Sequence, residues 1–271
     1  MYVVLGANTV ESYSQANELS FILGYSQNKQ SPYKLRIAFT TDELSTHLQL
    51  RDSHAVKYST ETPSSSNTNI VDNALTIGAY ISRIDLNASN SFRDYIYTPE
   101  HIKAESLDAM TLSQLEQNNY NFVSRIGNKT LNFGGDLMTG DNIITDFGTL
   151  AIENDLTYAL LDAVSDKQYM NDAGINTIVS TMENRITRYT KNGFLEVNSI
   201  YSGNDIVITY NNRDFSVIKN GTPLVKGFKI FTIPVRYITL ADRNDRRLPP
   251  IYVVLNTLSG VRTLEVVGSV V

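Results

Sequence analysis

The sequence predicts an α+β fold with mixed sheets, two main central helices and extended terminal β-strand arms. Two stretches, at about residues 143–164 and 172–191, carry apolar residues at spacings of three and four, which is typical of buried amphipathic helices. Short runs rich in β-branched and aromatic residues precede and follow them, which favours strands. The chain has 271 residues, of which 42% are hydrophobic, enough for one large domain or two ordinary ones.

The first third of the chain is predicted to be rich in strands. Apolar or alternating runs indicate strands at 19–24, 34–40, 75–84 and 91–98. Thr40 and Glu43 form a capping-box pattern for a helix that runs to about Leu50. The polar segment Glu61–Asn69 contains no apolar residue, so we expect it to be an exposed loop.

A short helix and a hairpin are expected next. Thr111 and Gln114 offer a capping box for the helix. The dipeptide Gly127-Asn128 is expected to turn a strand over 120–126 into a second strand over 130–133.

The middle of the chain is predicted to be helical. In the helix over 143–164 the apolar residues form two rows, which are Ile144, Phe147, Ala151, Tyr158 and Leu161, and Ile152, Leu156 and Leu160. We expect both rows to be buried. The helix over 172–191 is expected to begin at a cap formed by Asn171 or Asp172 and to close at Lys191-Asn192-Gly193.

Strands resume after the second helix. Residues 205–210 and 215–218 are expected to form a hairpin around Asn211-Asn212-Arg213-Asp214. The segment Phe228–Leu240 alternates over its whole length and predicts one long strand, in which Pro234 requires an edge position or a bulge.

Composition and motifs argue against catalysis. The chain has no cysteine, which excludes disulfides, thiolate metal sites and cysteine nucleophiles, and its three histidines lack metal-binding spacing. The segment Gly134–Asp141 lacks the pattern of a phosphate-binding loop, so a structural turn is favoured. Carboxylate pairs such as Glu105 with Asp108, or Asp162 with Asp166, are typical of solvated faces. We expect no metal, no cofactor and no enzymatic activity.

Charge and hydropathy limit the partners. The 23 basic and 28 acidic residues give a net charge of −5 without a long run of one sign, which argues against nucleic acid as the main partner. No apolar stretch approaches the ~18 residues of a membrane span, and no signal-peptide pattern opens the sequence. We expect a soluble protein that does not insert into membranes.

A charged turn precedes the last two apolar runs. It contains Asp242, Arg243, Asp245, Arg246 and Arg247, and it leads into Pro249 and Pro250. Alternating acids and arginines can lock a turn through internal ion pairs, or they can reach a partner with bidentate geometry. Both roles remain open at this point. The two prolines keep the entry to the final segment extended.

Both ends of the sequence are short, apolar and strand-forming. The first carries Tyr2, Val3, Val4 and Leu5, and the last carries Leu264, Val266 and Val267. Unpaired strand edges recruit other chains, so these segments are candidates for strands that link subunits. Alternatively, the two ends pair with each other inside one monomer.

Five motifs in order resemble the contractile-tail sheath proteins of bacteriophages, in a minimal form. They are Asn118-Asn119-Tyr120, Gly134–Asp141, Asp172-Ala173-Gly174-Ile175, Asn192-Gly193-Phe194, and the pattern Ala241-Asp242-Arg243, Arg246-Arg247 and Pro249-Pro250-Ile251. Together they cover about residues 107–271. Two features depart from the family: Ser259-Gly260-Val261-Arg262 replaces an apolar Gly-Ala-Ile-His stretch, and the loop Glu61–Asn69 stands where an outward-facing domain is commonly inserted.

The resemblance implies a virion structural protein, assembled in the host cytoplasm, that forms stacked rings around a tail tube and contracts to drive the tube into the host envelope. Its terminal arms would exchange strands between subunits, and its partners would be neighbouring sheath subunits, the tube protein, and baseplate and tail terminator proteins. The implied organisation is an N-terminal arm (1–18), a strand-rich part (19–106), a sheath-like core (107–258) and a C-terminal arm (259–271). The alternative is a tail tube or other ring-forming virion structural protein.

Overall fold

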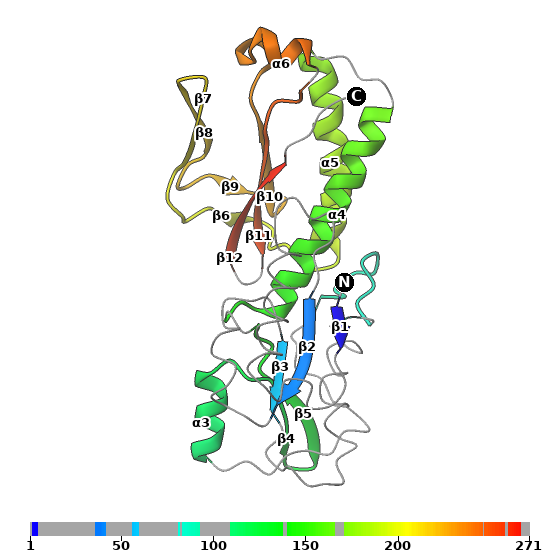
Figure 1. The fold of residues 1–271 in the computed structure, drawn as a ribbon, viewed down its shortest axis with the longest axis vertical. Coiled ribbons are helices and arrows are strands. Elements are labelled where there is room, and N and C mark those ends of the chain that lie inside the picture. The colour runs from blue at the N-terminus through cyan, green and yellow to red at the C-terminus, as the bar shows by residue number, and fades with distance from the viewer. Residues whose placement is uncertain are drawn as a thin grey trace, which may run out of the picture. The chain divides into compact units, whose positions relative to one another are not determined.

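A computed structural model of the chain describes ten stretches, which are residues 2–4, 36–41, 56–59, 81, 83–92, 109–137, 140–165, 171–245, 247–257 and 260–266 (Figure 1). These residues form helices and small sheets, which confirms the α+β class. The chain divides into two compact units, one of residues 1–85 and 93–146 and the other of residues 86–92 and 147–271. The predicted strand at 19–24 and loop at 61–69 lie outside the described residues, as do residues 42–50 of the predicted helix. The predicted start of this helix was wrong, since Thr40 lies in a strand over Arg36–Thr41.

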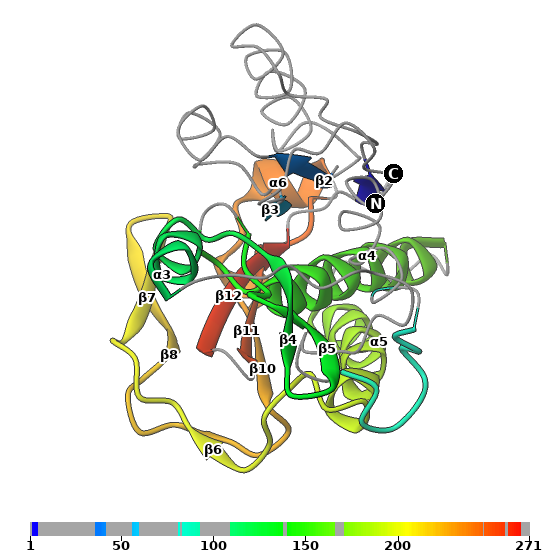
Figure 2. The same ribbon diagram turned by 90° about the horizontal axis from the view of Figure 1, so that it is seen from below.

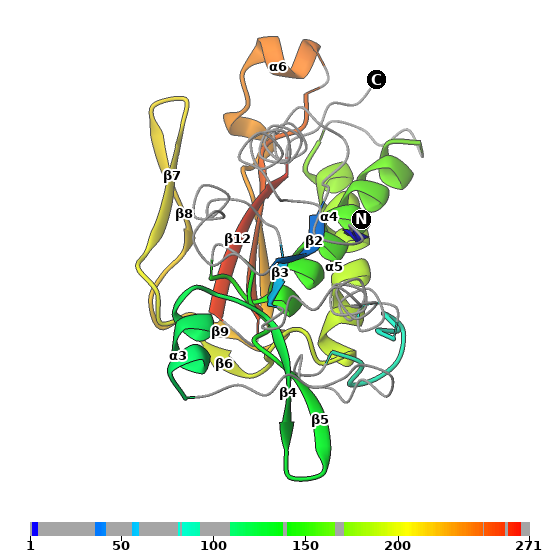
Figure 3. The ribbon, with the colours of Figure 1, turned by 60° about the horizontal axis from the view of Figure 1, so that its bottom comes forward.

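The first unit contains a three-stranded parallel sheet and an antiparallel hairpin. The sheet has the order β1 (Tyr2–Val4), β2 (Arg36–Thr41) and β3 (Val56–Ser59). The hairpin consists of β4 (Phe122–Ile126) and β5 (Lys129–Phe133), drawn as a two-stranded ribbon in Figure 3. The strand predicted at 34–40 and the hairpin predicted at 120–133 are confirmed. At 75–84 the described end is not a strand, because Ile81 is helical.

The hairpin of the first unit packs its aromatic residues together. The rings of Phe122 and Phe133 stack with centroids 5.4 Å apart, and Phe122 joins Leu115 and Tyr120 in a buried cluster. Leu115 belongs to helix α3 (Ala109–Gln117), which confirms the predicted short helix. Its predicted start was wrong, since Thr111 lies inside the helix.

The loop Gly134–Asp141 is a structural turn, as the sequence favours. The buried side chain of Asn121 accepts hydrogen bonds from the backbone N–H groups of Gly135 (2.6 Å) and Asp136 (3.3 Å), and its amide nitrogen donates to the carbonyl of Asp136 (2.9 Å). Gly134 has φ 95°, and a Cβ there would lie 2.6 Å from the Asn121 Oδ1 atom. The backbone N–H groups of Gly135 and Asp136 are therefore already bonded within the loop. Burial raises the pKa of the Asp136 carboxyl.

Two long helices dominate the second unit. Helix α4 (Ile143–Ser165) begins in the first unit and continues into the second, and α5 (Asp172–Lys191) begins at Asn171, whose side chain accepts from the N–H of Gly174 (2.9 Å). Helix α5 ends at Lys191, close to Gly193 with φ 85°. Both helices match the predicted ranges to within one residue.

One apolar row of α4 is more exposed than the sequence predicts. Tyr158 is 61% exposed and Leu161 57%, whereas Ile152, Leu156 and Ala159 are buried. Leu161 follows Ile152 by nine residues, or about two and a half helical turns, so it lies on the opposite side of the helix.

A buried polar contact joins α4 to α5. The Tyr189 hydroxyl, on a fully buried ring, donates to the Oδ2 atom of Asp155 (2.6 Å), and the Arg188 guanidinium forms an ion pair with the same carboxylate. Burial raises the pKa of the Tyr189 hydroxyl, and the charge of Arg188 opposes that rise. Because the carboxylate receives two donors, its burial is compensated. Nearby on the surface, Asp162 pairs with Arg185 (2.8 Å).

An antiparallel sheet packs beside these helices. It has the order β10 (Phe228–Thr232), β11 (Ile251–Thr257) and β12 (Gly260–Val266), with β11 in the middle. Figure 2 shows α4 and α5 on one side of this sheet. On β11, Ile251, Val253 and Leu255 alternate with Tyr252 and Val254, and all except Tyr252 are buried. Such a strand, buried on both faces, reads as a continuous apolar run.

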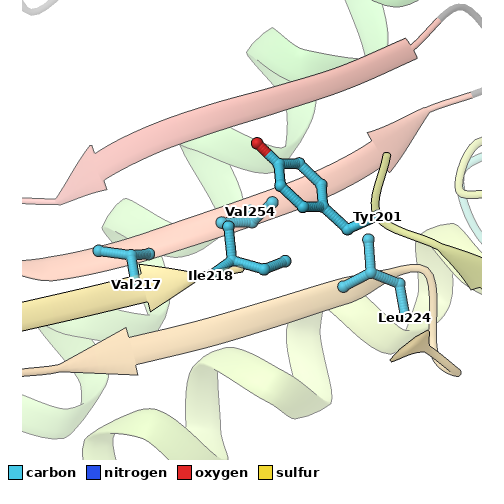
Figure 4. Close-up of a cluster of buried hydrophobic side chains, with 5 residues drawn as sticks. All are labelled: Tyr201, Val217, Ile218, Leu224 and Val254. Carbon is cyan, nitrogen blue, oxygen red and sulfur yellow. The ribbon is translucent and has the colours of Figure 1, made fainter. Parts of the chain in front are cut away.

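Two narrow ribbons cover the other face of the sheet. They are β6 (Ser199–Ile200) with β9 (Pro223–Leu224), and β7 (Ile206–Tyr210) with β8 (Arg213–Ile218). Their side chains meet β11 in a buried cluster, shown in Figure 4, of Tyr201, Val217, Ile218, Leu224 and Val254. The core of the second unit thus has three layers, which are the helices, the sheet and the ribbons.

The predicted hairpin is confirmed, but its turn is tighter than expected. Asn211 and Asn212 have φ values of 51° and 58°, and Arg213 and Asp214 already belong to β8. Asparagine tolerates the left-handed region, so two residues with positive φ make a turn that matches the twist of the strands.

The single long strand predicted over 228–240 was wrong. Strand β10 stops at Thr232, and the chain then forms a 3-10 helix η2 (Val235–Tyr237) and a short helix α6 (Leu240–Asn244). Pro234 has no N–H group, so it cannot continue the ladder to β11, and it stands directly before η2. The side chain of Thr239 then caps α6.

The packing of α4 gives a testable expectation. A Cβ at Gly148 would overlap the ring of Phe194, which is 1% exposed and packs on Phe92 with centroids 4.9 Å apart. Gly148→Ala should therefore lower the free energy of unfolding by about 1–3 kcal/mol, measured by denaturant titration. In a double-mutant cycle with Phe194→Leu, the smaller side chain should relieve part of that loss. Unchanged stability of Gly148→Ala would contradict this packing.

Candidate functional site

The charged turn before the last strands is held together by its own side chains. Thr239 and Asp242 bond reciprocally: the Asp242 N–H donates to Thr239 Oγ1 (3.0 Å), and that hydroxyl donates to Asp242 Oδ2 (2.7 Å). The Tyr210 hydroxyl at the end of β7 donates to the same carboxylate oxygen (3.2 Å). The turn is thereby tied to the β7–β8 hairpin.

These donors shift the titration of Asp242. The hydrogen bond from Thr239, followed by the bond from Tyr210 and the charge of Arg247, lowers the pKa of the Asp242 carboxyl, while desolvation opposes them. A carboxyl whose pKa is lower in the folded state stabilises the fold above its unfolded pKa, and that contribution is lost as the pH falls through the folded value. The turn should therefore loosen in acid.

Arg243 faces inward in the same turn. Its Nη2 atom donates to the carbonyl of Val235 (2.5 Å), and the Val235 N–H donates to Asp172 Oδ1 at the start of α5 (3.0 Å). Both backbone groups of the buried residue Val235 are thus bonded to charged side chains, and its carbonyl also accepts from the N–H of Ile238 (3.1 Å). The sequence left open whether Asp242 and Arg243 lock the turn or contact a partner. These contacts favour the first role.

Arg247 lies at the surface end of the turn. Its guanidinium is 3.9 Å from Asp242 and 3.6 Å from Asp245, and its side chain is 63% exposed. Pairs of this length and exposure contribute little to stability. Arg246 lies outside the described residues. Pro249 is buried and Pro250 half-buried, and both stand directly before β11.

Both terminal strands pair inside the chain in this structure. Val3 of β1 is the register partner of Ile37, and Leu264 and Val266 of β12 are those of Val253 and Ile251. Tyr2 and Val4 are also in β1, whereas Leu5 and Val267 lie outside the described residues. Strands β1 and β12 belong to different sheets, so in the described part of the chain the two ends do not pair with each other. Their exchange between subunits stays a prediction.

The sheet of the second unit nevertheless ends in an outer strand. Strand β12 pairs with β11 over seven register positions and has no second neighbour among the described strands. The outer side of such a strand carries backbone donors and acceptors that another chain can extend. This edge and the seven-position hairpin are the parts of the second unit that fit β-strand exchange.

Other site classes leave no trace in the ranges that the structure describes. Among those residues no three histidine or carboxylate side chains gather as a metal site would require. No helix there is long and apolar enough to cross a membrane. The three histidines, Glu105, Asp108 and Asp166 lie outside the described residues.

The sequence does not indicate the tie between Tyr210 and Asp242. The two residues are 32 positions apart, and an alternating strand shows which residues share a face but not which distant turn that face meets. The Thr239 cap was detectable, since Thr three positions before Asp is a cap pattern, but the apparent strand over 228–240 concealed it.

The turn yields a paired prediction for two arginines. Arg243→Ala should lower the free energy of unfolding by about 1–3 kcal/mol, because it removes a charge-assisted hydrogen bond to the buried carbonyl of Val235 and leaves that carbonyl only the N–H of Ile238 (3.1 Å). Arg247→Ala removes the same charge from an exposed position and should cost at most about 1 kcal/mol. Urea titration of both variants measures the difference. Equal effects would show that Arg243 does not act through that carbonyl.

Comparison with solved structures finds a similar fold in a phage-derived particle. A chain of the cryo-EM structure of the anti-feeding prophage baseplate, 6-fold symmetrised, superposes with a TM-score of 0.60 at 12% sequence identity, over 92% of this chain and 63% of that chain. This chain therefore spans less than two thirds of its neighbour's length. No protein-family model and no curated protein matches the sequence. At this identity, the likeness shows a shared fold.

Proposed function

We propose that this chain is a structural subunit of a contractile phage tail or of a phage-tail-like particle. The observation that carries the proposal is the fold shared with a baseplate chain over 92% of this chain. Fold alone does not give function. The independent support is the series of motifs in the sequence that resembles contractile-tail sheath proteins.

In its finer form, the proposal is a tail sheath subunit. The motifs that carry the resemblance stand at the ends of helices and strands, where backbone geometry restricts the residue type: before β4, before α4, at the start of α5, after α5 and before β11. The subunit would polymerise as stacked rings around a tail tube and contract to drive the tube into the host envelope. Its partners would be other sheath subunits, the tube protein, and the baseplate and terminator proteins.

The second unit has the mechanical properties that this role requires. Two helices, a sheet and two ribbons share one packed core, joined by the buried Asp155, Arg188 and Tyr189 contact, so they can move as one body. Strand β12 is at the edge of that body. Rigid bodies joined by exchanged strands can rearrange without losing their links, which is the kind of motion that contraction needs.

A second candidate is a ring-forming baseplate component that does not contract. The observation in its favour is that the similar chain belongs to a baseplate with sixfold symmetry. A tail tube protein is the remaining alternative. Electron microscopy of the purified chain separates these roles, because a sheath subunit should form long hollow cylinders, whereas a baseplate component should form single closed rings.

Strand exchange can be tested with engineered disulfides, because the chain contains no cysteine. Tyr252 of β11 and Glu265 of β12 are register partners. In Tyr252→Cys/Glu265→Cys, we expect oxidation of assembled particles to give covalent multimers on a non-reducing gel, since β12 would then pair with β11 of another subunit. The unassembled chain should give only cross-linked monomers.

The matched control joins β11 to its other neighbour. Phe231 of β10 is the register partner of Tyr252, and both strands belong to the same rigid sheet. Phe231→Cys/Tyr252→Cys should therefore give monomers in particles and in free chains. Monomers alone from assembled Tyr252→Cys/Glu265→Cys would reject exchange of β12, although it would leave a structural role in place.

A further inference from the structure

Two exposed arginines converge on one tyrosine in the second unit, away from the terminal strands. The guanidinium carbon of Arg213, in β8, lies 5.1 Å from the centroid of the Tyr237 ring, and that of Arg236 lies 4.9 Å from it. Both distances fall within the ~6 Å range of cation–π attraction. The ring therefore gathers two positive charges that would otherwise repel each other.

Contacts with the β7–β8 hairpin hold Tyr237 in place. Its ring meets the ring of Phe215 edge-on, with centroids 5.3 Å apart and an interplanar angle of 66°. The Asn211 side chain donates to the Tyr237 carbonyl (3.1 Å). The β7–β8 hairpin and η2 thus present the two arginines from a fixed platform, which lowers the entropy lost when a partner binds.

Carboxylates of the described residues do not neutralise the two guanidinium groups. Within the described ranges neither forms an ion pair, whereas Arg185, Arg188 and Arg247 each do. The carboxylate of Asp214, next to Arg213, accepts a hydrogen bond from the Thr209 hydroxyl (2.7 Å). The two arginines are thus positive groups without a carboxylate partner in the described part of a chain whose net charge is −5.

An exposed apolar residue adjoins this pair along the chain. Leu240, three positions after Tyr237, is 76% exposed, the highest value among the exposed large apolar residues of the described chain. Tyr and Arg are enriched where protein partners bind most strongly, and an exposed leucine adds apolar area that a phosphate backbone would not cover.

We propose that Arg213, Arg236, Tyr237 and Leu240 form a docking site for an acidic segment of another protein. The guanidinium groups would bind carboxylates through paired hydrogen bonds, and Leu240 would contact an apolar side chain of the same segment. This site goes beyond the proposed structural role and does not depend on strand exchange. Nucleic acid fits less well, since the exposed Leu240 offers apolar area that a phosphate backbone would leave uncovered.

The test uses the full chain and a fluorescently labelled peptide of glutamates with one leucine, followed by fluorescence anisotropy. We expect weak, salt-sensitive binding that Arg213→Gln/Arg236→Gln reduces about five- to tenfold, since each exposed charge pair contributes only modestly. Lys191→Gln/Lys219→Gln removes two exposed charges elsewhere and should bind like the wild type.

Further variants and probes control for misfolding and test the chemical class of the partner. Arg213→Lys/Arg236→Lys keeps both charges but loses the planar fork, so it should fold normally and bind between the wild type and the glutamine variant. Leu240→Ser should weaken the leucine peptide but not an all-glutamate peptide. Absence of binding to the wild type, equal loss in both glutamine variants, or tighter binding of an oligonucleotide of the same charge would each overturn the proposal.

Discussion

The burial of β11 on both faces is the constraint on which the second unit depends. Helices α4 and α5 must bury their apolar faces against another apolar surface, and so must the two ribbons. Both surfaces come from the same seven-residue strand, Ile251–Thr257, whose register with β10 and β12 therefore determines which side chains face each layer. A slip of one residue would exchange the two faces and break both layers together.

The charged turn fixes the connection between β10 and β11, and so it helps to set that register. The chain leaves β10 at Thr232 and must return antiparallel as β11 beginning at Ile251. The excursion is fixed at its start by Asp172 and Arg243 on Val235, and in its middle by Asp242 with Thr239 and Tyr210. Ionised groups thus fix a connection that also buries Ile233, Val235, Ile238 and Leu248. The same residues figure in the resemblance to sheath proteins, which links that pattern to a fold requirement.

Local sequence patterns predicted much of this architecture because their physical causes are local. The ranges of α4 and α5 follow from apolar spacing and from the Asn171 cap, and the β7–β8 hairpin follows from alternation around an asparagine pair. The failures depend on distant contacts. The exposure of Tyr158 and Leu161 depends on which face of α4 meets other elements, which apolar spacing does not give. A helical segment replaced a strand after Pro234 because other elements satisfy its backbone groups. For the candidate site, sequence indicated the strands and the turn but not Tyr210 or the Tyr237 platform.

The hairpin of β11 and β12 has a consequence for how such subunits could join. If β12 leaves its own β11 for that of another copy, the same seven register positions are broken in one place and made in another. The ladder is conserved, so the swap itself would change the free energy little, as in domain swapping between identical chains. Strand exchange would then act as a latch that keeps copies together, and the driving force for polymerisation would have to come from other surfaces.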